Sequence, residues 1–176
     1  MEFRISPLIK ITLLLLLLAL TLPLPFLAIA TQQAGRLWLT VGGVVSGFCI
    51  IYLALGDRII LDDQSIKLVS YLPLKKGWQI QWSDIVALKP KTTGQGGLVY
   101  YLLTKSGEGY LLPMRVAGFS KLVRAIQAKT NLDMQDVKPL AQPWMYFILL
   151  FFSLILLLFD GWIIHQALTN HLVPYS

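Results

Sequence analysis

The residues that most suggest chemistry lie in the glycine-containing stretch at residues 89–101, which reads KPKTTGQGGLVYY. Glycines beside lysines could form a loop that binds phosphate. A phosphate-binding loop of the G-x-x-x-x-G-K-[ST] type needs a helix to begin directly after its glycines, so that helix amides and the lysine reach the phosphate. Here the lysines precede the glycines, and Gly97 leads into a strand-like run. We therefore interpret the stretch as a loop between two strands and expect no nucleotide ligand.

Acidic residues are the remaining candidates for catalysis, because residues 57–142 contain no histidine and no cysteine. Their absence removes the commonest general base, the best nucleophile and the usual ligands of transition metals. Asp62 and Asp63 form a pair at an expected turn, where water solvates adjacent carboxylates. Asp84 follows a serine at a strand bend, where such side chains bond nearby backbone amides. We expect no enzymatic activity, no metal and no cofactor.

One acid, Asp160, falls inside an apolar run, where an ionisable side chain is by default a functional candidate. It lies roughly 24 Å along that run from Trp144, which places it near the far interface. A charged side chain there costs little free energy. His165 is about 140° further around the helix, so the two side chains do not share a face. A proton or metal site formed by Asp160, His165 and His171 is one interpretation; an interfacial cap or a contact with a partner subunit is the other.

The elements that position these residues follow from a composition unlike that of a soluble domain. Of the 176 residues, 56% are hydrophobic and 14% are charged, whereas soluble domains carry about 25% charged residues. Crossing a bilayer takes about 20 apolar residues, and three runs are long enough: residues 8–30, 37–56 and 144–164. Pro23 and Pro25 should kink or end the first helix. We predict an integral, multi-pass membrane protein.

Basic residues set the expected orientation in the membrane. Arg4 and Lys10 lie at the start of the chain, twelve Lys or Arg residues lie within residues 57–142, and none follows the third span. The positive-inside rule then places the N-terminus and the soluble region in the cytoplasm and the C-terminus on the opposite side. Residues 28–30 (AIA) also have the form of a signal-peptidase site, but the length of the apolar run favours a retained helix.

Short strands make up the first part of the soluble region. In residues 77–89, tryptophan and isoleucine alternate with glutamine, and this period of two marks a half-buried strand. Residues 98–105 are apolar on both faces, which indicates a central strand. Pro113 cannot donate a hydrogen bond to a sheet, so the strand of residues 110–116 lies at an edge or ends there.

The last part of the soluble region has the period of a helix. One apolar stripe recurs at i, i+3, i+4 and i+7: Phe119, Leu122, Val123 and Ile126. Asn131 is a suitable stop signal, so we expect this helix at about residues 118–130. We predict an α+β membrane protein with three transmembrane helices and a small antiparallel β-barrel or sheet closed by one C-terminal amphipathic helix. Its parts are an N-terminal membrane hairpin (1–56), a cytoplasmic domain (57–142), and a third span with a short external tail (143–176).

The order of these elements has a parallel among known domains. A basic turn at residues 73–77, the run WQIQWSDIVALK, a loop, LVYYLLTKSGEGYLLPMR and a final helix follow one another in the chain. In order and length they resemble the bacterial pleckstrin-homology-like domains attached to membrane spans, over roughly residues 57–131. The most specific piece is W-S-D-I at residues 82–85. The resemblance implies a pleckstrin-homology-like fold.

A second resemblance concerns the whole arrangement. Two N-terminal spans followed at once by such a domain, with L-P-M-R at residues 112–115, are similar to the photosystem I assembly protein family of cyanobacteria and chloroplasts. The third span has no counterpart there, so the chain would be at most a distant relative of that family. Residues 94–144 also resemble small cyanobacterial membrane proteins. These resemblances imply a thylakoid or bacterial inner membrane and work in assembly or scaffolding.

Small residues on the second span could form a helix-packing surface. Gly43 and Gly47 are one turn apart, with Gly42 and Ser46 in the adjacent register. Such a strip lets another helix approach closely. That helix belongs either to this chain or to a partner subunit, and the sequence favours neither.

Four lysines fall in two expected loops that a small barrel could bring together: Lys75, Lys76, Lys89 and Lys91. A basic patch near anionic lipid gains about 1 kcal/mol per residue. Positive-inside bias with solvated lysines explains them equally well. Nucleic acid is disfavoured, because the aromatic residues Trp78 and Trp82 alternate into one face.

Short linkers at residues 56–58 and 138–143 tie the domain to the membrane at both ends, so it should act as a fixed platform. We expect a non-enzymatic scaffold, assembly factor or accessory subunit of a photosynthetic membrane protein complex such as a photosystem. Its partners would be the lipid bilayer and that complex. The alternatives are a membrane-surface module that binds anionic lipid through the basic loops, and a proton- or ion-linked membrane component that uses Asp160.

Overall fold

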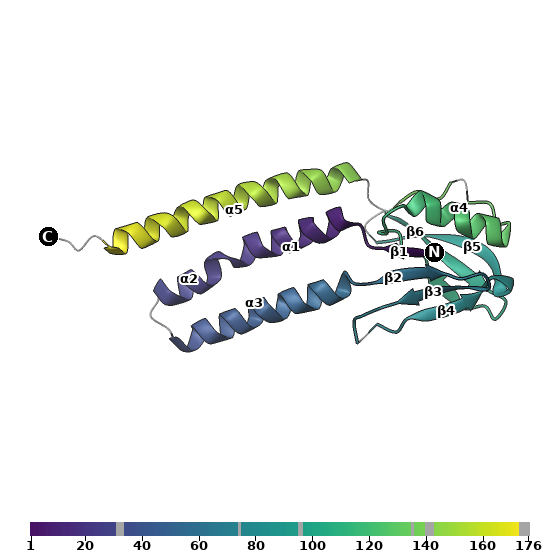
Figure 1. Cartoon of the computed structure of the whole chain (residues 1–176), viewed down its shortest axis with the longest axis horizontal. Coiled ribbons are helices and arrows are strands. Elements are labelled where there is room, and N and C mark those ends of the chain that lie inside the picture. The colour runs from purple at the N-terminus through teal and green to yellow at the C-terminus, as the bar shows by residue number, and fades with distance from the viewer. Residues whose placement is uncertain (31–33, 74, 95–96, 135, 140–142, 173–176) are drawn as a thin grey trace. The chain divides into compact units, whose positions relative to one another are not determined.

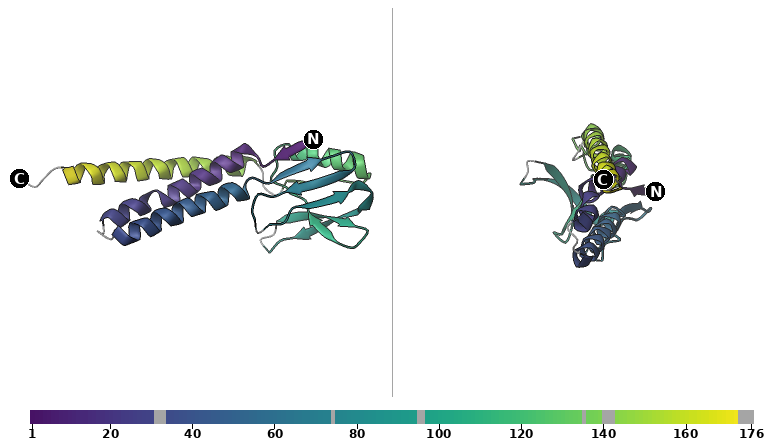
Figure 2. Two further views of the ribbon diagram at one scale, coloured as in Figure 1. Left: turned by 60° about the horizontal axis from the view of Figure 1, so that its bottom comes forward. Right: turned by 90° about the vertical axis from the view of Figure 1, so that its left-hand side faces the viewer.

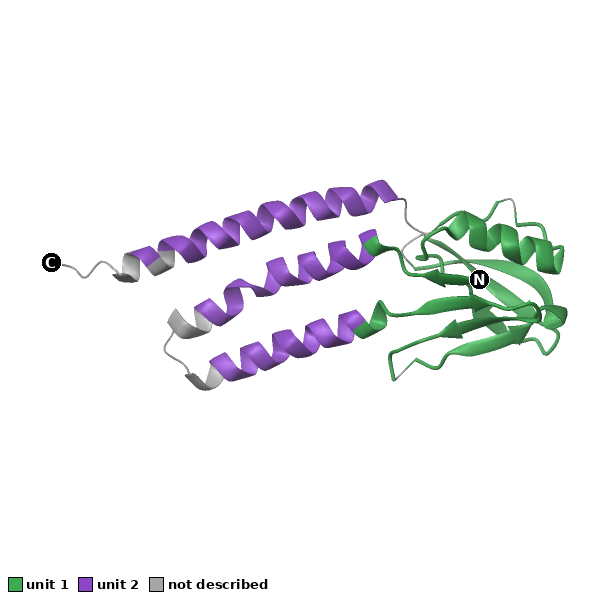
Figure 3. Cartoon of the chain, in the orientation of Figure 1, with its two compact units in different colours: residues 1–7, 53–142 green, residues 8–52, 143–176 purple. Residues whose placement is uncertain are grey.

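The chain divides into two compact units. The computed structural model describes residues 1–30, 34–73, 75–94, 97–134, 136–139 and 143–172 (Figure 1). The first unit comprises Met1–Pro7 and Leu53–Gln142, and the second comprises Leu8–Tyr52 and Pro143–Ser176 (Figure 3). The first unit holds the described strands and an amphipathic helix, and the second holds the apolar helices. The predicted α+β class is confirmed.

The apolar helices are α1 (Pro7–Thr21), α2 (Pro23–Ala30), α3 (Ala34–Ala54) and α5 (Pro143–Leu172). Three of their stretches are long and apolar enough to cross a membrane, close to the spans predicted from the sequence: Pro7–Phe26, Leu37–Ala54 and Pro143–Gln166. The first is interrupted between α1 and α2, as its prolines predict. Pro23 begins α2, where its missing amide hydrogen costs no hydrogen bond, and Leu22 N still donates to Leu18 O at 2.8 Å.

The first sheet of the domain is antiparallel and four-stranded, in the order β1-β2-β3-β4. Its strands are β1 (Glu2–Arg4), β2 (Arg58–Leu61), β3 (Ser65–Val69) and β4 (Trp78–Gln81). Ile59 lies opposite Leu68, and Ile66 lies opposite Ile80. These cross-strand pairs are buried on one face, which forms part of the core. In β4 the glutamines are exposed and Ile80 is buried, so the predicted alternation is confirmed.

A short 3₁₀ helix, η1 (Trp82–Asp84), leads into the second sheet, which is antiparallel and three-stranded in the order β5-β6-β7. Its strands are β5 (Ile85–Thr92), β6 (Leu98–Thr104) and β7 (Gly109–Leu111). The central position predicted for residues 98–105 is confirmed, because β6 lies between the other two. Pro113 follows the end of β7. The described strands of the two sheets do not join into a closed barrel, so the sheet form of our prediction applies.

Helix α4 (Phe119–Thr130) runs along one side of the two sheets (Figure 2). All members of its predicted apolar stripe are buried, with Leu122 and Ile126 fully inaccessible to solvent. The helix ends at Asn131, which adopts a left-handed conformation with φ of 54° and donates its amide hydrogen to Gln127 O at 2.8 Å. Asparagine tolerates this conformation better than most residues, so the predicted stop is confirmed.

The N-terminal strand β1 is the element that the sequence did not predict. We expected the first residues to flank the membrane hairpin, whereas Glu2 pairs with Ile60 and Arg4 pairs with Arg58 in β2. The other edge of this segment contacts the chain after β7: Ala117 N donates to Arg4 O at 2.8 Å, and an isolated bridge joins Ile5 to Val116. The hairpin of α1, α2 and α3 is therefore inserted into the chain between two paired strands.

This pairing constrains the path of the chain through any membrane. Because β1 and β2 share a sheet, both must lie on the same side, and the chain between them must cross an even number of times. Two apolar stretches of sufficient length, Pro7–Phe26 and Leu37–Ala54, lie between them. Cleavage after Ala30 would separate β1 from the rest of the chain, so the pairing favours a retained first helix.

Cross-linking tests the register of β1 on β2. In a Cys49→Ser background, the pair Glu2→Cys and Ile60→Cys should form a disulfide in the purified chain on mild oxidation, because these residues are direct register partners. The pair Glu2→Cys and Arg58→Cys should not, since diagonal neighbours lie about 7–8 Å apart and a disulfide needs Cα atoms within about 6.8 Å. Mass spectrometry of the oxidised protein reads out both pairs, and equal cross-linking of the two would contradict the register.

Candidate functional site

The structure separates the four predicted lysines into two groups. Lys75 and Lys76 lie between β3 and β4, as expected. Lys89 and Lys91 lie on β5 and not in a loop, because this strand continues to Thr92. The turn comes later, where Thr93 N donates to Gly97 O at 2.7 Å. Our placement of Lys89 and Lys91 in a loop is wrong, while the prediction that Gly97 leads into a strand is confirmed.

Strand register shows what surrounds the two strand lysines. Lys91 is the direct partner of Val99, and Lys89 is the partner of Tyr101, which pairs in turn with Leu111. Direct partners in an antiparallel sheet present their side chains to the same face. Lys89 and Lys91 therefore share one face of the second sheet with partly exposed apolar residues.

A cavity of 380 Å³ opens in the domain beside this face, and we call it the basic-rimmed cavity. Its charged lining residues are Asp57, Arg58, Lys75, Lys76 and Arg115. The rest of its wall is apolar, with contributions from Leu55, β2, β3, β6 and the segment after β7 that includes Leu112 and Met114. Val99 and Leu111 belong to this wall, whereas Lys89 and Lys91 do not. The cavity thus joins two of the four predicted lysines to two arginines distant in sequence.

The buried carboxylate of Asp57 organises one side of the basic-rimmed cavity. Asp57 is 8% exposed, it accepts a hydrogen bond from Ser70 Oγ at 2.7 Å, and it forms an ion pair with Lys75. A buried carboxylate is tolerated when its oxygens are bonded in this way. These contacts hold the β3–β4 connection against the start of β2. The ammonium group of Lys75 is therefore already paired with Asp57.

Arg58, the next residue along the chain, also lines the cavity. Its Nη1 lies 3.3 Å from Glu2 Oε1, and its guanidinium stacks over the ring of Tyr71 at 5.0 Å from the centroid. Hydrogen bonding from Arg4, with a smaller contribution from Arg58, lowers the pKa of Glu2 below its ordinary value. The Nε of Arg58 is buried and has no hydrogen-bond partner within the described residues. One strong donor of the rim therefore lacks an acceptor.

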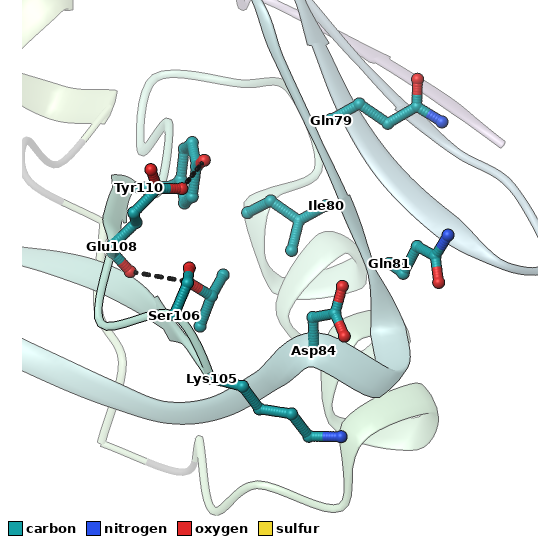
Figure 4. A pocket seen from close by; sticks show the side chains of 9 residues that line it. Gln79, Ile80, Gln81, Asp84, Lys105, Ser106, Glu108 and Tyr110 are labelled. Atoms are coloured by element: carbon teal, nitrogen blue, oxygen red, sulfur yellow. Dashed lines mark hydrogen bonds between the residues drawn. The ribbon is translucent and has the colours of Figure 1, made fainter.

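A second cavity, of 540 Å³, is polar. Figure 4 shows Gln79, Ile80 and Gln81 of β4 on one side and Ser106, Glu108 and Tyr110 on the other. Its polar groups bond to one another: Tyr110 OH donates to Glu108 Oε2 at 2.5 Å, and the hydroxyls of Thr104 and Ser106 lie 2.8 Å apart. Asp84, the acid considered for catalysis, also lines this cavity. The carboxylate of Glu108 and the hydroxyl of Ser106 are thus engaged with separate neighbours.

The small-residue strip of α3 is open. A Cβ atom added at Gly42, Gly43 or Gly47 would meet no atom within 4 Å. The hydroxyl of Ser46 bonds back to its own helix, because Oγ donates to Gly42 O at 2.6 Å. The strip is therefore lined by small side chains. Within the described part of the chain, no neighbouring helix fills the space that these residues leave.

The sequence did not predict how far the side chain of Asp160 is buried. It is 6% exposed, and its Oδ2 atom has no hydrogen-bond partner among the described residues. Ser153, two turns earlier on α5, is also buried and donates to Leu149 O at 2.7 Å. His165 is exposed, so the prediction that it lies on another face of the helix is confirmed.

The structure adds no ligand to the metal or proton site that the sequence suggested at Asp160, His165 and His171. Within the described residues, no group of three or more His, Cys, Asp or Glu side chains could hold a metal ion. The side chain of His171 lies outside the described residues.

Removing the Asp57 carboxylate should destabilise the domain. We expect Asp57→Ala to lower the free energy of unfolding by about 2 kcal/mol, because it removes a buried acceptor that bonds both Ser70 and Lys75. The matched control is Asp63→Ala, whose carboxylate is fully exposed and 3.4 Å from Lys129; an exposed pair contributes about 0–1 kcal/mol. Denaturant unfolding of the full chain in detergent compares the two. Equal losses would show that the Asp57 contacts contribute no more than a surface pair.

The polar cavity predicts a pH effect at Tyr110. Its hydrogen bond to Glu108, together with burial and the carboxylate charge, raises the pKa of the Tyr110 hydroxyl above its ordinary value. Glu108→Gln removes the charge, so Tyr110 should then ionise at lower pH. Ultraviolet titration of tyrosinate, with a Tyr110→Phe variant subtracted to isolate the signal, measures the change; an unaltered titration in Glu108→Gln would refute this contact.

Comparison with known proteins finds a relative of similar length. The chain is 49% identical over 160 residues to the "Uncharacterized protein slr0269" of the cyanobacterium Synechocystis sp., and the match covers 88% of this chain and 80% of that protein. A match of this extent includes parts of both compact units. No protein-family model and no solved structure matches the chain.

Proposed function

The chain belongs to the same family as protein slr0269 of Synechocystis, and on this premise we propose that it is a non-enzymatic membrane scaffold or assembly factor for a photosynthetic membrane complex. The domain faces the cytoplasm and the C-terminus lies on the opposite side of the thylakoid or inner membrane. The cyanobacterial relative supports the cellular setting, and the resemblance to photosystem I assembly proteins supports the class of partner.

The observation that carries this proposal is the open strip on α3. Small residues at a helix surface let backbones approach closely in lipid, where packing rather than the hydrophobic effect drives association. The positions of Gly42, Gly43 and Gly47 leave room that no described helix of the chain occupies. A helix of a partner protein is the occupant that this proposal supplies.

The domain contributes a platform joined by short links to two apolar helices, while residues 140–142 of the third predicted link lie outside the described residues. Three residues separate α3 from β2, and two separate β1 from α1. Sheets of four and three strands followed by a C-terminal helix support a pleckstrin-homology-like architecture, a type of small domain that presents surfaces to partners. Linkers this short leave the domain little freedom to swing.

Affinity purification tests the proposal. A tagged full chain, extracted from a cyanobacterium in mild detergent, should co-migrate with a pigment-protein complex on a native gel. The double variant Gly43→Leu and Gly47→Leu should reduce that co-migration by about tenfold, because bulky residues block a close approach and important contacts contribute roughly 1–2 kcal/mol.

The matched control enlarges two exposed residues with the same spacing on another face of α3, Val45→Leu and Cys49→Leu. It should leave co-migration unchanged. Recovery of the wild-type chain without any pigment-protein complex would refute the assembly role. Equal losses in both double variants would refute the strip as the contact surface.

A further inference from the structure

The wall of the basic-rimmed cavity includes the last residue of a helix that is long and apolar enough to cross a membrane. Ala54, the last residue of α3 and of the apolar stretch Leu37–Ala54, lines it together with Leu55. The next lining residues along the chain are Asp57 and Arg58. A wall that begins at the final residue of a membrane-spanning stretch is close along the chain to the level of lipid headgroups.

The cavity has both charged and apolar lining residues. Four cations and one carboxylate line it, a formal balance of 4 − 1 = +3, and its other lining residues are apolar. The volume of 380 Å³ falls within the roughly 300–1,000 Å³ of small-molecule sites. A purely apolar ligand would leave the cations without a counter-charge, and a small free anion would leave the apolar walls unused. An amphiphile with an anionic head satisfies both.

The cations differ in how far they are already paired. Lys75 is held by Asp57, and Arg58 is partly compensated by Glu2 but keeps a buried Nε without an acceptor. Lys76 and Arg115 take part in none of the salt bridges within the described residues. Arginine presents a planar set of donors that suits the oxygens of a phosphate or sulfonate group. Lys76 and Arg115 are thus the lining cations that no described salt bridge engages.

We propose that this cavity binds one anionic lipid of the surrounding membrane. Its phosphate or sulfonate oxygens bond to Arg58, Lys76 and Arg115, and the first carbons of an acyl chain lie against Leu55, Leu112 and Met114. The binding does not depend on the partner complex of the preceding proposal. It gives the domain a preference for membranes rich in anionic lipid.

Native mass spectrometry of the purified full chain in uncharged detergent tests this inference. The protein is titrated with phosphatidylglycerol or with phosphatidylcholine of the same acyl chains, and bound lipids are counted. We expect one phosphatidylglycerol to remain bound in clear preference to phosphatidylcholine. The double variant Lys76→Glu and Arg115→Glu should weaken that binding by about tenfold or more, because each cation near anionic lipid contributes about a factor of five.

A charge-matched control and a charge-neutral variant separate the two halves of the site. Lys121→Glu with Arg124→Glu makes the same charge change on exposed residues of α4 outside the cavity and should leave binding intact. Ala54→Trp fills part of the wall without altering charge and should also weaken binding. Melting temperatures equal to that of the wild type show that each variant is folded.

Several outcomes would overturn the inference. Equal binding of the two lipids by the wild-type chain would exclude recognition of an anionic head. Loss of binding in the Lys121→Glu and Arg124→Glu control would assign the preference to overall charge. Displacement of the lipid by millimolar inorganic phosphate would identify a site for free anions. Unchanged binding in Ala54→Trp would exclude the apolar wall.

Discussion

The antiparallel pairing of β1 with β2 is the interaction on which the domain depends, since it joins segments that lie before and after the first two apolar stretches of the chain. β1 bonds on both edges, to β2 on one side and to residues 115–117 on the other. An unpaired edge of β2 would expose a row of backbone donors and acceptors. The same pairing places the two ends of the inserted hairpin at the register partners Arg4 and Arg58, so it determines where the helices leave the domain.

Long periodic patterns were predictable from the sequence, whereas short or non-local pairing was not. The stripe of α4, the three apolar stretches and the central strand β6 each carry a signal over many residues. β1 has only three residues, too few for a period to stand out, and its partner lies beyond a whole hairpin. The glycines of residues 89–101 made the end of β5 look like part of a loop, but the strand continues to Thr92. β5 is an edge strand, where the missing donor of Pro90 can face away from the sheet.

The candidate sites show the same division. Lys75 and Lys76 were identified from the sequence as a basic turn, but Asp57, Arg58 and Arg115 join them only because β2, the β3–β4 connection and the segment after β7 meet in space. Counting residues along α5 placed Asp160 at an interface, whereas its burial depends on which side of the helix packs inward. Counting gives a distance along the helix, whereas the side of the helix that is buried depends on the neighbouring elements.

The separation of β1 from its partner also imposes an order on synthesis. Residues 1–6 are made before the two apolar stretches and β2, so they cannot pair until β2 has followed. The hydrogen bond from Met1 N to Leu61 O joins residues 60 positions apart. If either stretch failed to insert, β1 and β2 would end on opposite sides of the bilayer and the sheet would remain incomplete. A complete sheet in the domain therefore requires that the two apolar stretches cross a membrane together or not at all.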